Sequence, residues 1–114
     1  MIAVIFEVEP HSDKRQAYLD LASELRPLLM EIEGFISVER FESLTQPGKI
    51  LSLSFWRDEE AIAAWRRSSA HRKAQSIGRK DHFKDYRLRI AGVIRDYGIT
   101  ERAQVPADSQ NFHH

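Results

Sequence analysis

The chain contains no cysteine among its 114 residues, and this absence excludes disulfide bonds, thiolate nucleophiles and thiolate-ligated metal sites. Long apolar stretches are missing too, since no run approaches the roughly 18 apolar residues that span a bilayer. The segment 1–10 is apolar, but it lacks a basic flank and contains Glu7 and Glu9, so it does not have the pattern of a signal peptide. We therefore expect a cytoplasmic protein that does not bind a membrane.

Net charge is absent as well, because 17 Lys and Arg balance 17 Asp and Glu. Acidic residues dominate before residue 65, however, and basic residues dominate over 65–95. A basic half attracts anionic ligands such as a carboxylate or a nucleic acid, but few aromatic residues interleave this run, and nucleic-acid binding gains little support from it. We expect the acidic and basic residues to pair within the fold or across a dimer. The expected pairs across strands join Arg87, Arg89 and Arg95 to Glu7, Glu9, Glu39 and Glu42.

Apolar periodicity predicts four strands and two helices in the order βαββαβ. The strands are expected over residues 2–9, 35–44, 50–56 and 83–97. The helices are expected over about 13–30, capped by Ser12 or Asp13, and over 58–82, capped by Asp58 and interrupted near Ser68. This order predicts an α+β fold, a ferredoxin-like sandwich with a split second helix. We expect one domain over 1–100 and a polar tail over 101–114.

The predicted sheet has apolar residues on both of its faces. Strands 35–44 and 83–97 carry apolar or aromatic side chains on either side, whereas helices are expected to cover one face only. An uncovered apolar sheet face usually marks a binding surface for a partner. We therefore predict a homodimer in which two sheets pack face to face and approach a barrel.

The segment 54–79 holds the residues that are most informative about function. Trp65 follows Ile62 at i+3, so it lies on the inward face of an amphipathic helix, where it fills a core or walls a cavity. His71 has a side chain whose pKa lies near neutral pH, so it can act as a general base or ligate iron. A hydrogen-bonded structural histidine is the alternative.

Gln75 and Arg79 follow His71 at i+4 and i+8 and form a polar stripe on one helix face. Such a stripe can hydrogen-bond substrate oxygens and stabilise a developing anion, although a solvated face is the commoner case. Trp56 at a strand end and Tyr86 on the last strand are further candidates for substrate binding. His71 and His82 are eleven residues apart with no third ligand, and we predict no metal site. The terminal His113 and His114 are not interpreted as metal ligands.

The sequence LSLSFWRDEEAIAAWRRSSAHRKAQSIGRKDHFKDYRLRIAGVIRDYG, residues 51–98, resembles the antibiotic biosynthesis monooxygenase (ABM) domain family. The resemblance includes Trp65, His71 and the two pairs that follow them, Ala74-Gln75 and Gly78-Arg79. The order and length of elements agree over residues 1–100. It implies a dimeric α+β barrel with one cavity in each protomer. It also implies one of two activities: oxidation of aromatic substrates by molecular oxygen without metal or flavin, or binding and degradation of heme.

The chain departs in two ways from the heme-degrading pattern that the resemblance implies. The iron-ligating histidine of that pattern lies about a turn beyond His71, where this chain has Gln75, and the first strand lacks an asparagine. We therefore expect a cofactor-independent monooxygenase acting on a small aromatic or quinol-like molecule. In it His71 is the base, Trp65 the wall, and Gln75 and Arg79 the anion stabilisers. The alternatives are a heme-binding or heme-degrading monooxygenase and a non-catalytic dimeric module that binds a small molecule.

Overall fold

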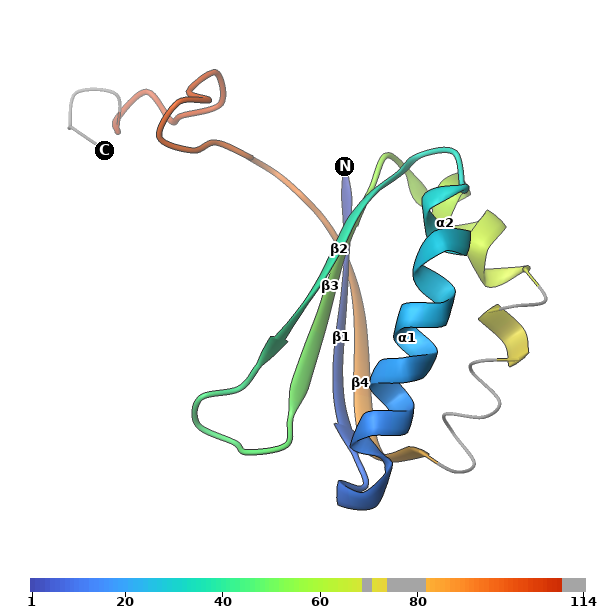
Figure 1. The fold of residues 1–114 in the computed structure, drawn as a ribbon. Helices are drawn as coiled ribbons and strands as arrows, with labels where there is room; N and C mark the ends of the chain where they lie inside the picture. Colours follow the sequence, from blue (N-terminus) through green and yellow to red (C-terminus); the bar gives the residue numbers. More distant parts are fainter. Residues whose placement is uncertain (69–70, 74–81, 110–114) are drawn as a thin grey trace.

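A computed structural model describes residues 1–68, 71–73 and 82–109 of the chain. Four antiparallel strands form one sheet in the order β2-β3-β1-β4, and the helices pack on one face of it (Figure 1). The elements are β1 (Ile2–Pro10), a 3₁₀ turn (Ser12–Lys14), α1 (Arg15–Met30), β2 (Phe35–Glu42), β3 (Ile50–Trp56), α2 (Glu59–Arg66) and β4 (Phe83–Gly92). The predicted βαββαβ order and the ferredoxin-like α+β class are confirmed.

Two strands end earlier than predicted. β4 stops at Gly92 rather than at residue 97, because it pairs with β1, and Gly92 lies opposite Ile2 at the very start of that strand. The Val93 N–H still donates to the Met1 carbonyl at 3.0 Å, and residues 93–97 form no strand. β2 stops at Glu42, and the Ser43 hydroxyl then accepts hydrogen bonds from the following turn.

The helix caps agree in part with the prediction. Asp58 caps α2, accepting a hydrogen bond from the Ala61 N–H at 2.9 Å. Ser68 Oγ accepts one from the His71 N–H at 3.1 Å, and residues 71–73 are helical, as predicted for a second helical piece. The predicted capping of the first helix by Ser12 or Asp13 is wrong, because both residues belong to the 3₁₀ turn and Lys14 stands at the cap of α1 without a side-chain hydrogen bond.

The core lies between the sheet and the helices in two clusters. The larger joins α1, α2 and the sheet, and the smaller surrounds Val8, which is fully buried. Gly34, with a φ of 90°, lets the turn before β2 approach α2, since a Cβ at this position would lie 2.8 Å from the Ala61 Cβ. The members of the larger cluster are Leu29, Val38, Trp56, Ala61 and Ile62.

Residues 93–109 form no helix or strand and extend away from the sheet (Figure 1). Turns join parts of this segment, including a hydrogen bond from the Asp96 N–H to Gln104 Oε1 at 2.7 Å. Across the described parts of the chain, no helix has the length and apolar character needed to cross a membrane.

Candidate functional site

A cavity of about 270 Å³ lies between the helix-covered face of the sheet and helices α1 and α2. Strand alternation brings Val4 and Phe6 of β1 and Leu88 and Ile90 of β4 to its floor, in the register Phe6–Leu88 and Val4–Ile90. The register therefore places these four residues on one face of the sheet. Most of the lining is apolar, so the cavity suits a small ligand whose body is apolar.

Strand β3 contributes polar residues to the cavity. Ser52 and Ser54 face it and are buried, while Leu53 points to the opposite, open face of the sheet. The Trp56 indole N–H donates to Ser54 Oγ at 2.8 Å, and Trp56 is only 2% exposed. This strand therefore places hydroxyl groups where most core strands place aliphatic side chains.

Trp65 and His71 lie together on the helical side of the cavity. Their ring centroids are 5.3 Å apart and their planes are tilted by 55°. Both side chains are half-buried and both line the cavity. His71 Nδ1 is buried and has no hydrogen-bond partner among the described residues. A buried acceptor or donor without a partner is costly, and such atoms commonly mark a functional site.

Burial lowers the pKa of the His71 imidazole below its ordinary value of 6.5. A hydrogen bond with the Arg66 backbone opposes this change, and the positive charge of Arg66 adds to it. The imidazole is therefore neutral at neutral pH, with one ring nitrogen able to accept a proton. A neutral imidazole beside an apolar cavity has the protonation state that a general base requires.

The two candidates for substrate binding on strands both line this cavity. Trp56 closes one end, where its ring meets Phe35 edge to face at 5.2 Å. Its N–H is already used by Ser54, so it offers a ligand only its apolar surface. Tyr86 is 47% exposed and packs against Phe6 at 5.8 Å. Gln75 and Arg79 lie outside the described residues.

Two cavity residues, Tyr18 and Arg40, were not among the sequence-based candidates. Tyr18 comes from α1 and is buried, and Arg40 comes from β2 and is half-buried. Arg40 Nε donates to the Tyr18 hydroxyl at 3.3 Å. The signal for Arg40 was its place two residues after Val38, on the strand face that the pattern assigns to the core.

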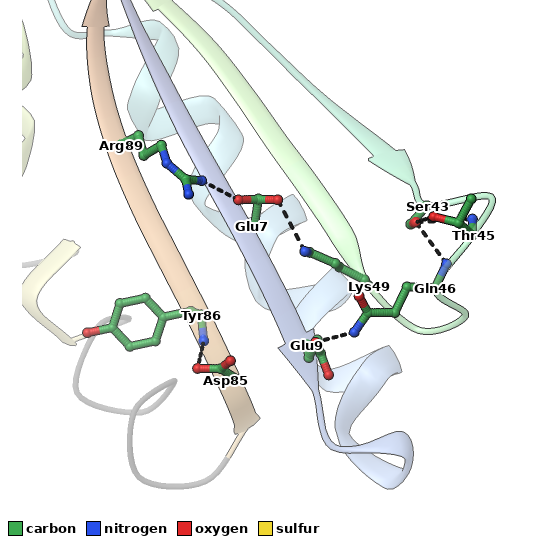
Figure 2. A network of polar contacts seen from close by, with 9 residues as sticks. All are labelled: Glu7, Glu9, Ser43, Thr45, Gln46, Lys49, Asp85, Tyr86 and Arg89. Carbon is green, nitrogen blue, oxygen red and sulfur yellow. Dashed lines mark hydrogen bonds and ion pairs between the residues drawn. The ribbon is translucent and has the colours of Figure 1, made fainter.

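The open face of the sheet carries charged residues, shown in Figure 2. Glu7 forms ion pairs with Lys49, at 3.2 Å, and with Arg89, as predicted for Arg89. Hydrogen bonds from Lys49 first and then Arg89 lower the pKa of the Glu7 carboxyl. The hairpin end is held by a hydrogen bond from the Gln46 amide to Glu9. Within residues 1–68, 71–73 and 82–109, no group of three or more His, Asp or Glu is placed to hold a metal ion.

Comparison with known proteins identifies the same family as the sequence pattern. The model of the family "Antibiotic biosynthesis monooxygenase" matches residues 1–76. A "Jasmonate monooxygenase ABM" from Pyricularia oryzae is 48% identical over 105 residues, which are 92% of this chain and 49% of that protein. The chain thus spans about half the length of this relative.

Two further comparisons extend the likeness to bacterial proteins. The uncharacterised protein YqjZ from Bacillus subtilis is 30% identical over 93 residues, covering 82% of this chain and 79% of that protein. The solved structure of Rv0793 from Mycobacterium tuberculosis has a TM-score of 0.76 at 18% identity, covering 85% of this chain and 98% of that one. The structural likeness supports the fold.

Proposed function

The chain belongs to the antibiotic biosynthesis monooxygenase family, and we propose that it oxidises a small apolar substrate with molecular oxygen inside the cavity. The observation that carries this proposal is the position of His71, which stands at the wall of an apolar cavity against Trp65 with its Nδ1 buried and unpaired among the described residues. An apolar surrounding keeps the imidazole neutral, which is the state that a general base requires.

We propose that the reaction needs neither metal nor flavin and acts on an activated methylene, such as that of an anthrone-like aromatic molecule. His71 takes one proton from the methylene, and the resulting carbanion gives its electrons to oxygen. The hydroperoxide that forms then loses water and leaves a carbonyl group. One oxygen atom enters the product and the other leaves as water, so the substrate supplies all the electrons.

Jasmonate is the second candidate substrate, because the relative with that name is 48% identical over nearly the whole chain. The mass of the product distinguishes two outcomes. A carbonyl product gains one oxygen and loses two hydrogens, whereas a hydroxylated product keeps all its hydrogens and requires two electrons from an added reductant.

We propose that heme is not the ligand of this cavity. At about 270 Å³, the cavity is slightly smaller than the roughly 300–1,000 Å³ of ligand pockets, and a porphyrin is larger than the usual ligands of such pockets. A hemin titration tests this inference directly. We expect the absorbance spectrum of free hemin, and a saturable, shifted Soret band at one heme per protomer that is lost in His71→Gln would contradict it.

We propose that the active form is a homodimer joined through the open face of the sheet. Half-buried apolar side chains occupy the middle of this face. One register line runs across it from Arg89 through Ile5 and Leu53 to Glu39, so the β4 side is basic and the β2 side acidic. The apolar residues that the register places on this face are Ala3, Ile5, Phe41, Leu51, Leu53, Phe55 and Ala91.

Two-fold symmetry can match these charges. When the axis runs parallel to the strands, β4 of one protomer lies over β2 of its partner, which brings basic residues opposite acidic ones twice. Arg87 and Glu39 have no ion-pair partner among the described residues, so both are available for such contacts.

The test of the enzymatic proposal is oxygen consumption by the purified chain, with an anthrone and with jasmonate as substrates. We expect His71→Gln to lower turnover by about 10²- to 10⁴-fold, as for the loss of a general base. His11→Gln is the matched control, because His11 is exposed and lies outside the cavity. Trp65→Ala should weaken substrate binding while the fold is retained.

Two outcomes would contradict the proposal. Full turnover in His71→Gln would remove this residue as the base. Binding of substrate without any oxygen consumption in the native chain would favour the third hypothesis, a non-catalytic dimeric module that binds a small molecule.

A further inference from the structure

The guanidinium of Arg40 is a cation inside a largely apolar cavity. Its register with Ser52 of β3 places it on the helix-covered face of the sheet, and it lines the cavity together with Tyr18. The side chain is half-buried. A partly desolvated charge is unfavourable unless an opposite charge or hydrogen bonds compensate it.

The compensation that Arg40 receives is incomplete. Its Nε donates to the Tyr18 hydroxyl at 3.3 Å, and its guanidinium carbon lies 5.8 Å from the centroid of the Tyr18 ring. No carboxylate in the described parts of the chain lies within ion-pairing distance of it, whereas Arg15, Arg57 and Arg89 each have at least one. Tyr18 thus orients the guanidinium through Nε while the two terminal nitrogens have no hydrogen bond to a described residue.

A guanidinium that presents two terminal nitrogens in one plane matches the two oxygens of a carboxylate. We propose that Arg40 binds the carboxylate of the substrate, and that this cavity therefore selects small apolar acids over their neutral analogues. The apolar floor formed by Phe6, Leu88 and Ile90 would hold the body of such an acid. The inference rests on the proposed function in taking this cavity as the substrate site.

The positions of Arg40 and His71 also indicate how the substrate is oriented in the cavity. Arg40 lies on β2, the strand at one edge of the sheet. Arg66, whose positive charge acts on the His71 imidazole, lines a surface hollow together with Ile90. Ile90 belongs to β4, the strand at the other edge. Three strand spacings of about 4.8 Å separate these edges, roughly 14 Å. An elongated acid held by Arg40 at one end thus extends its other end toward His71 and Trp65, and we expect oxidation at the end remote from the carboxylate.

Calorimetric titration with matched acid and ester pairs tests the inference independently of turnover. The probes are jasmonate with methyl jasmonate, and 1-naphthoate with methyl 1-naphthoate. The native chain should bind at least one acid more tightly than its ester, by roughly tenfold to a hundredfold, as expected for a charge-assisted hydrogen-bonded pair. Arg40→Met should lose this preference and keep the affinity for the ester, and Arg40→Lys should retain part of it.

Arg95→Met is the matched control, since Arg95 is exposed, lies beyond the end of β4 and does not line the cavity. Equal binding of acids and esters by the native chain, absence of acid binding, or an acid preference that survives in Arg40→Met would each overturn the inference. The proposed function fails differently. If acids bind through Arg40 but no oxygen is consumed, the carboxylate site stands and the monooxygenase proposal falls.

Discussion

The rings of Trp65 and His71 lie against each other, with centroids 5.3 Å apart. This contact connects the end of α2 to the next helical segment, which begins under the Ser68 cap. The proposed base is therefore positioned by the same aromatic ring that walls the cavity. A change in Trp65 is expected to alter both ligand binding and the environment of the imidazole.

The pH dependence of the stability that His71 contributes has a predictable sign. Burial lowers the pKa of folded His71 below 6.5, so the unfolded chain binds a proton more readily than the folded chain. The stability contributed by the neutral imidazole is complete above pH of about 6.5 and is lost as the pH falls through the lower pKa of the folded state. The measurement is the urea midpoint of the native chain and of His71→Gln from about pH 8 to about pH 5.

The difference between the two midpoints should shrink toward acid pH, and turnover should fall over the same range. His11→Gln serves as the control for general acid effects. A difference that is constant or grows as the pH falls would show that His71 is not held neutral by burial.

The hydrogen bond between Trp56 and Ser54 should contribute to stability through both partners. Ser54→Ala leaves the buried indole N–H without its acceptor, which should lower the free energy of unfolding by about 1–3 kcal/mol. Trp56→Phe leaves the serine hydroxyl without its donor and should have a cost of similar size. The double variant should lose less than the sum of the two, because no unpaired group remains.

Chemical denaturation of the four proteins gives this coupling. Ser52→Ala is the matched control, since Ser52 is also buried on β3 but has no side-chain hydrogen bond to a described residue. Strict additivity in the double variant would mean that the two groups do not interact.

Gly34 and Gly48 should tolerate alanine differently, although both have positive φ angles, 90° and 86°. Alanine in this backbone region costs about 1–2 kcal/mol at either position. Gly34→Ala also brings its Cβ to 2.8 Å from the Ala61 Cβ, whereas the Cβ of Gly48→Ala meets nothing within 4 Å. We expect Gly34→Ala to be the more destabilising by a further 1–3 kcal/mol or so, the usual cost of overpacking.

Thermal or chemical unfolding of the two variants tests this expectation, and Gly92→Ala, which has open space and no positive φ, should be close to neutral. Equal losses at Gly34 and Gly48 would show that the turn before β2 does not press on α2.

The proposed dimer predicts a charge-exchange result. Glu39→Arg alone should weaken self-association, because it places like charges opposite the basic side of the partner, and Arg87→Glu alone should do the same. The combined variant should recover dimerisation, because both signs are exchanged. Sedimentation velocity at several concentrations measures it. Asp13→Lys, an exposed charge change in the turn before α1, is the control.

If the native chain sediments as a monomer at high concentration, the dimer proposal is wrong. If it is a dimer but the single variants have no effect, the two sheets do not meet in the orientation proposed.

Much of the fold could be predicted because its signals are local. The alternation of Val4, Phe6 and Val8 assigned one face of β1, and the carboxylate of Asp58 ahead of α2 supplied a cap that the structure contains. The end of β4 could not be predicted in this way. The alternating pattern continues beyond Gly92, whereas the pairing with β1 ends where Gly92 lies opposite Ile2.

The candidate site was likewise predictable only where its signals are local in the sequence. Sequence spacing alone indicated that Trp65 faces inward and that His71 follows a break in the helix, because each depends on neighbours within a few residues. Tertiary structure decided three other features of the site: the contact of Arg40 with Tyr18, the hydroxyl group of Ser52 in the cavity, and the uncompensated charge there. These contacts join segments distant in sequence, and strand periodicity defines two faces without stating what packs against either.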